Sequence, residues 1–120
     1  MTQQTAALVF AEPSGVIRIW TPGAEALFGH PAANAIGQSL DLIVPPDYRE
    51  RHWAGYCAAM EVADGIIDHS MFDIPAVHRD GSIIRVEVRL LVIHDSRNRM
   101  VGAMAVFVPA DSSAPPIERL

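Results

Sequence analysis

The 120-residue chain contains no lysine and only one cysteine, Cys57. A lone cysteine forms neither an internal disulfide nor a cysteine-cluster zinc site, and we expect it to be a small buried residue of a helix. All nine basic residues are arginines, which are scattered without a basic cluster, and the net charge is -5. We therefore expect no direct contact with nucleic acid, because neutralising phosphates takes a concentrated positive face.

Long apolar runs are also absent. No segment approaches the roughly 18 apolar residues that a membrane-spanning helix needs. The N-terminus lacks the basic segment and apolar core of a signal peptide. We expect a cytoplasmic protein without a membrane partner, folded as one domain because half of its residues are hydrophobic.

Catalytic motifs are missing as well. The chain has no glycine-rich phosphate loop, no nucleophile elbow and no paired acidic motif. We interpret Asp41 and Asp47 as ordinary loop carboxylates, and Asp68 and Asp73 as carboxylates without a catalytic role. We predict no catalytic residue, and we do not expect an enzyme.

The first third of the chain predicts a hairpin followed by two short helices. Residues 6–11 and 16–20 have strand patterns, and the turn Pro13-Ser14-Gly15 separates them. Thr21-Pro22 is typical of a helix start, with threonine as the N-cap, and Gly29 predicts the end of that helix. A second short helix fits residues 32–36 and is closed by Gly37.

The remainder predicts one long helix and three strands. The helix spans residues 47–62, and strands fit residues 67–77, 84–92 and 100–108. Two strands, then helices, then three strands indicate an α+β fold, an antiparallel five-stranded sheet with helices packed over one face. Such a fold leaves an interior gap of small-ligand size. Residues 1–5 are predicted to be flexible, and residues 110–120 to be a linker.

Several short motifs stand in a characteristic order along this predicted fold. They are Gly15-Val16-Ile17, residues 20–30 (WTPGAEALFGH), Ala35-Ile36-Gly37-Gln38, Leu42-Ile43-Val44-Pro45 and Arg79-Asp80-Gly81-Ser82. In this order and spacing, residues 6–109 resemble the PAS domain, a sensory module. The resemblance implies a PAS fold that binds a small ligand between the long helix and the sheet.

His52 lies about two turns into the predicted long helix, seven residues after Pro45 and 27 before Arg79. This position is similar to that of the proximal iron ligand in oxygen-sensing haem PAS domains. The resemblance therefore implies haem as a cofactor, with His52 on the iron. Neutral imidazole is a good iron ligand, and the small residues Gly55, Ala59 and Ala63 share the helix face of His52. A structural or surface role for His52 is the alternative.

The predicted ligand pocket departs from an oxygen sensor in two ways. Phe72 takes the place of a distal arginine, and Tyr56 follows His52 by four residues, one further than in those sensors. Carbon monoxide, nitric oxide and redox change then stand beside oxygen as candidate signals. The register of the strand decides which side chain near Phe72 faces inward. The predicted lining comprises His52, Tyr56, Ser70, Met71, Phe72, Ile84, Val86 and Met104.

The resemblance also implies partners. We expect a homodimer through a contact between PAS domains, and an effector such as a transcription regulator, in the same chain or on a separate protein. The prolines after Asp111 argue against a continuous signalling helix and favour a flexible linker. The alternative is a PAS interaction module with a packed interior and no cofactor. A flavin photosensor would need a reactive cysteine among the short helices, whereas Cys57 falls on the long one.

Overall fold

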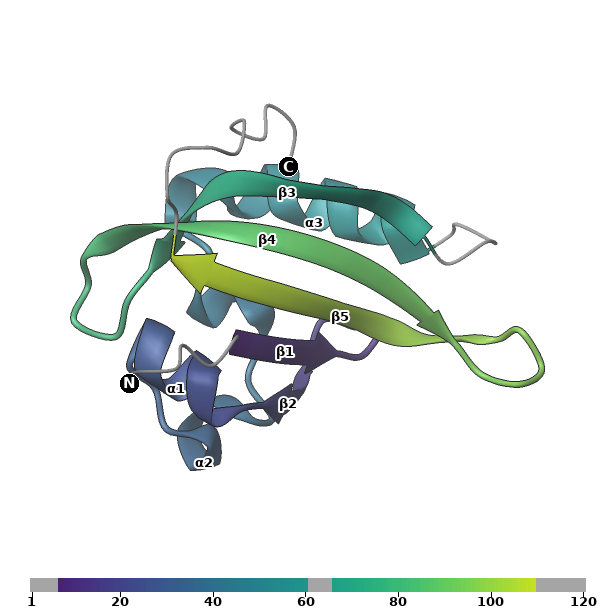
Figure 1. Ribbon diagram of the computed structural model, residues 1–120, viewed down its shortest axis with the longest axis horizontal. Helices are drawn as coiled ribbons and strands as arrows, with labels where there is room; N and C mark the ends of the chain where they lie inside the picture. Colours follow the sequence, from purple (N-terminus) through teal and green to yellow (C-terminus); the bar gives the residue numbers. More distant parts are fainter. Residues whose placement is uncertain (1–6, 61–65, 110–120) are drawn as a thin grey trace, which may run out of the picture.

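The computed structural model describes residues 7–60 and 66–109, with the side chains of all of these except 55, 58–60 and 66–73 (Figure 1). The elements in chain order are β1 (Ala7–Ala11), β2 (Ile17–Trp20), α1 (Pro22–Phe28), α2 (Ala32–Ala35), the 3₁₀ turns η1 (Leu40–Leu42) and η2 (Pro46–Tyr48), α3 (Arg49–Met60), β3 (Ile66–Val77), β4 (Ile83–His94) and β5 (Met100–Pro109). The predicted order of strands and helices is confirmed.

The five strands form one antiparallel sheet in the order β2-β1-β5-β4-β3 (Figure 1). The last strand, β5, therefore lies in the middle and joins the N-terminal hairpin to the β3–β4 hairpin. The predicted α+β class and five-stranded sheet are confirmed. The two hairpins form one sheet only because β1 pairs with β5, which lies about a hundred residues further along the chain. Ala7, for example, pairs with Phe107.

The short helix α1 begins and ends where its capping residues predict. The Thr21 hydroxyl oxygen accepts hydrogen bonds from the Ala24 N–H at 3.4 Å and the Leu8 N–H at 2.9 Å. Thr21 therefore caps the helix and ties it to β1 at once. Gly29 ends the helix with a φ of 84°, a left-handed conformation that glycine adopts without steric penalty.

The core lies between the short helices and one face of the sheet. Its largest fully buried side chains are those of Val9, Ile17, Phe28 and Val86. The Phe28 ring centroid lies 5.1 Å from that of Phe107, edge to face, and 5.5 Å from that of Trp20. Burial of these aromatic rings supplies much of the apolar area that stabilises the fold.

The two faces of the sheet differ in what covers them. On β5, Ala105 and Phe107 belong to the core cluster, whereas Met104 pairs with Phe10 of β1 and lies on the opposite face. Side chains alternate between the faces of a strand, so Met104 and Phe107 cannot share one. Met104 was predicted to line the interior pocket, but the structure places it on the outer face.

The predicted long helix is shorter and starts later than its sequence pattern suggests. Pro46 to Tyr48 form a 3₁₀ turn, and α3 begins only at Arg49. His52 is therefore the fourth residue of α3, not two turns into it. Cys57 is exposed, which contradicts the expectation of a buried cysteine. Within the parts of the chain described, no helix is long and apolar enough to cross a membrane.

Candidate functional site

Three aromatic side chains gather near the start of α3. The ring centroid of His52 lies 4.8 Å from that of Trp53, edge to face, and 5.9 Å from that of Tyr56, nearly stacked. The centroids of Trp53 and Tyr56 lie 5.5 Å apart. Tyr56 follows Trp53 by three residues and His52 by four, so its ring lies beside both of theirs. They form a cluster that we call the α3 aromatic cluster, His52, Trp53 and Tyr56.

Trp53 joins α3 to two segments that precede it. Its indole N–H donates a hydrogen bond of 2.7 Å to the Asp41 carboxylate of η1. Its ring covers Gly15, where an added Cβ would overlap the ring atoms. Gly15 also has a φ of 87°, so both the backbone and the close approach of Trp53 require glycine there.

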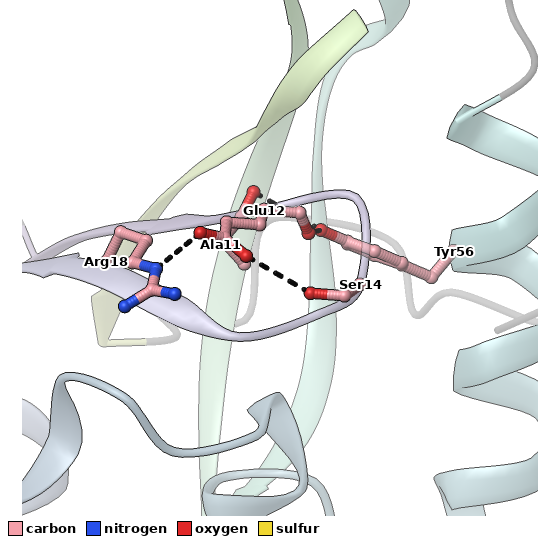
Figure 2. Close-up of polar contacts among 5 residues, drawn as sticks. All are labelled: Ala11, Glu12, Ser14, Arg18 and Tyr56. Atoms are coloured by element: carbon pink, nitrogen blue, oxygen red, sulfur yellow. Dashed lines mark hydrogen bonds and ion pairs between the residues drawn. The ribbon is translucent and has the colours of Figure 1, made fainter.

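Tyr56 reaches from α3 to the turn between β1 and β2 (Figure 2). Its hydroxyl donates to the backbone carbonyl oxygen of Glu12 and lies 3.3 Å from that of Ala11. Burial raises the pKa of Tyr56 to about 12, with minor contributions from Cys57 and Glu12, so the hydroxyl remains a donor at neutral pH. Tyr56 was predicted to line the ligand pocket. In the structure its hydroxyl is hydrogen-bonded to the β1–β2 turn.

His52 is half-buried, and its Nδ1 atom is sequestered from solvent without a hydrogen-bond partner in the described structure. Burial lowers the pKa of His52, and the attraction of the Asp41 carboxylate opposes this only in part. The imidazole is therefore neutral at pH 7. An unpaired buried nitrogen is costly, by about 1–3 kcal/mol, so a native protein that keeps one calls for an explanation.

A neutral imidazole with an unshared nitrogen is a good ligand for haem iron. Among the residues that the structure describes, no three histidine, cysteine, aspartate or glutamate side chains converge as metal ligands. A metal at His52 would therefore depend on one protein ligand and on a group that supplies the others, as a macrocycle does. His52 therefore has the donor chemistry of a haem ligand.

The remaining predicted lining residues fall into two groups. Val86 is fully buried in the core cluster, and Ile84 packs against it from the same strand. Ser70, Met71 and Phe72 lie on β3, where their side chains are outside the described part; the pairing of β3 with β4 resumes at Phe72 and Val88 after a shift of register. Their place in a pocket stays a prediction.

Sequence reasoning missed the residues that anchor the α3 aromatic cluster. Asp41 was interpreted as an ordinary loop carboxylate, yet it accepts the Trp53 indole hydrogen bond. Gly15 was interpreted as a turn residue and as part of a family motif, but not as a residue against which a tryptophan ring lies. Neither contact has a local signal, since the partners are 12 and 38 residues apart in the sequence.

The model of the family described as "PAS fold" matches residues 1–109. The chain belongs to the PAS family, whose members are in general sensory modules without catalytic activity. An uncharacterized protein of Azorhizobium caulinodans is 29% identical over 83 residues, which are 68% of this chain and 11% of that protein. The chain therefore spans about a tenth of the length of this relative.

Solved structures of PAS domains have the same fold. The PAS domain of a Colwellia psychrerythraea protein is 28% identical with a TM-score of 0.76, over 88% of this chain and 86% of that one. The PAS domain of a LuxR-family transcriptional regulator from Burkholderia thailandensis, in complex with ethanol, is 17% identical with a TM-score of 0.67, over 89% and 90%. A light-oxygen-voltage domain studied with a flavin analogue is 15% identical with a TM-score of 0.68, over 90% and 79%. The latter two likenesses concern the fold alone.

Proposed function

We propose that this PAS domain is a sensor that binds haem through His52, in a site between α3 and the sheet. The observation that carries the proposal is the neutral, half-buried imidazole, one nitrogen of which has no hydrogen-bond partner among the described residues. His52 would hold the haem iron through such an imidazole, and the bond would pair the nitrogen that otherwise lacks a partner. Bound haem supplies a site for a diatomic gas or for a change of redox state.

The residues of this chain would hold and orient the haem ligand. The rings of Trp53 and Tyr56 pack against the His52 ring on two sides and limit its rotation. Asp41 fixes Trp53 by the indole hydrogen bond, so the orientation of His52 depends on η1 as well as α3. Val86 and Ile84 provide apolar surface on the core face of β4.

We propose that the sensor acts on an effector in the cytoplasm, in the parent chain or on a separate protein. PAS domains commonly dimerise and accompany effector domains, and the chain matches only 11% of its Azorhizobium relative. The relation in fold to the PAS domain of a LuxR-family regulator supports a transcription regulator as the effector. Ligand binding would then shift the domain between two packings that the effector distinguishes.

A second candidate is a cofactor-free PAS domain that serves to form homodimers. The outer face of the sheet favours it, because apolar side chains there have no helix over them in the part of the chain described. These side chains include Phe10, Ile19, Leu91, Met104 and Val106, and Ile19 is 44% exposed. The other four are partly exposed, and apolar surface gathered on one face is typical of contact surfaces in other proteins.

One titration separates the two candidates. Purified protein is titrated with haem and its visible absorption is recorded, together with its molar mass in solution. We expect a Soret band that saturates at equimolar haem, because a neutral imidazole is a good iron ligand. His52→Ala should weaken haem binding by more than about tenfold. His30→Ala, which removes a half-buried histidine beside Trp20 instead, should leave binding unchanged.

A protein that stays colourless after the haem titration contradicts the haem proposal. If the same protein is a dimer, the second candidate is supported. A Soret band that survives in His52→Ala and disappears in His30→Ala would show that His30 binds the iron, and would contradict the assignment of His52. A monomer at high concentration contradicts the homodimer.

A further inference from the structure

α3 is attached to the tip of the N-terminal hairpin by side chains from a single helical turn. Tyr56 and Glu12 are 44 residues apart in the sequence, and their hydrogen bond joins α3 directly to the β1–β2 turn (Figure 2). Three residues earlier on the helix, the Trp53 ring covers Gly15 of the same turn. Helix and turn therefore meet through two contacts of different kinds, one polar and one steric.

The Tyr56 hydroxyl shares its acceptor with a hydrogen bond that closes the turn. The Gly15 N–H donates to the Glu12 carbonyl oxygen at 2.7 Å, and the Glu12 N–H donates to the Val16 carbonyl oxygen at 2.9 Å. The Glu12 carboxylate also pairs with Arg18 across the hairpin (Figure 2). A shift of Tyr56 would therefore disturb the Glu12 carbonyl oxygen, which also accepts the Gly15 hydrogen bond that closes the turn.

The turn stands next to an irregularity in the sheet. The pairing of β1 with β2 changes register between Phe10 and Ala11, and Ala11 is the second residue that the Tyr56 hydroxyl approaches. Ala11 also pairs with Ala103 of β5, the central strand. A bulge bends its strand and disrupts the hydrogen-bond ladder, so the pairing of β1 with β2 is interrupted next to the turn.

His52 lies against both side chains that make the attachment. Its ring packs edge to face on Trp53 and nearly parallel to Tyr56. Because the His52 ring contacts both neighbouring rings, a displacement of His52 would move them as well. The attachment and the proposed ligand position are thus parts of one cluster.

We propose that Tyr56 and Trp53 form a latch between α3 and the β1–β2 turn, and that displacement of His52 loosens this turn through them. The role of the latch in signalling rests on the proposed function. The mechanical coupling of His52 to the turn does not depend on haem. The N-terminal hairpin is then the part of the domain that changes when the helix moves.

The latch is tested by amide hydrogen exchange in the free protein. Tyr56→Phe removes one oxygen atom and keeps the ring against His52, so the fold should survive. We expect the amides of Glu12 and Gly15 to exchange about five-fold faster, the ratio that the loss of one ordinary hydrogen bond corresponds to. Tyr48→Phe is the matched control, because the other tyrosine lies on η2 with its ring beside Arg51. That variant should exchange at the wild-type rate.

The coupling is tested by adding His52→Ala, or His52→Asn if the alanine variant does not fold. Each single variant should accelerate exchange at Glu12 and Gly15. The double variant with Tyr56→Phe should show less than the product of the two accelerations, since both act through the same contact. Wild-type exchange in Tyr56→Phe overturns the latch, and independent, multiplicative effects overturn its coupling to His52. If haem does not bind, the exchange results for the latch and for its coupling to His52 are unaffected. That outcome therefore refutes the proposed function alone.

Discussion

Replacing Gly15 by alanine should lower the free energy of unfolding by about 3 kcal/mol. A non-glycine residue at positive φ costs roughly 1–2 kcal/mol, and overpacking adds about 1–3 kcal/mol. Both apply here, because Gly15 has a φ of 87° and an added methyl group would overlap the Trp53 ring. Chemical denaturation of the two proteins measures the difference. Since a small domain is stabilised by only about 5–15 kcal/mol, this is a large effect.

Gly37→Ala is the matched control for this substitution. Gly37 has a φ of 93°, but no described atom lies within 4 Å of an added Cβ. Gly37→Ala should therefore lower the free energy of unfolding by about 1 kcal/mol, through the backbone conformation alone. In a protein that also carries Trp53→Ala, Gly15→Ala should lower it by the same amount. Equal losses for the two glycines in the wild-type background would show that Trp53 does not lie against the turn.

Phe28→Ala is expected to destabilise the domain by about 3–5 kcal/mol, the range for removing a fully buried phenylalanine. The Phe28 side chain is 0% exposed and contacts the rings of Trp20 and Phe107. Its loss therefore leaves a cavity between α1 and the central strand of the sheet. Thermal and chemical denaturation measure the change in stability.

The control for Phe28 is an apolar residue at the surface. Ile36 directly follows α2 and is 44% exposed. Its replacement by alanine should lower the free energy of unfolding by only about 0.5 kcal/mol. The ratio of the two effects reports where the core lies. Comparable losses at the two positions would contradict the packing of α1 on the sheet.

Local signals predicted most of the fold. Thr21 and Gly29 delimit α1 because their side chain and backbone act within one helical turn. Arg79-Asp80-Gly81 likewise falls in the turn between β3 and β4, as the Asp-Gly pair predicts. The start of α3 was predicted too early, because Pro46 is compatible with both a 3₁₀ turn and an α-helical first turn.

The site was predictable only in part, since its contacts cross the sequence. His52 was found from its position after the proline pair, but nothing local indicates that the Tyr56 hydroxyl reaches Glu12. The face of Met104 depends on the register of β5 against β1, which a distant pairing decides. Long-range register and ring packing therefore determine what sequence periodicity leaves open.

The central claim is that α3 presents a neutral, half-buried imidazole, and nuclear magnetic resonance of the histidine rings tests it most directly. The chain has five histidines, and the signals absent from His52→Gln identify His52. Because the effect of burial outweighs the attraction of the Asp41 carboxylate, the pKa of His52 should lie below the ordinary value of 6.5. The stability that His52 contributes above pH 6.5 should then be lost as the pH falls through its folded pKa. A pKa at or above 6.5 would contradict the account.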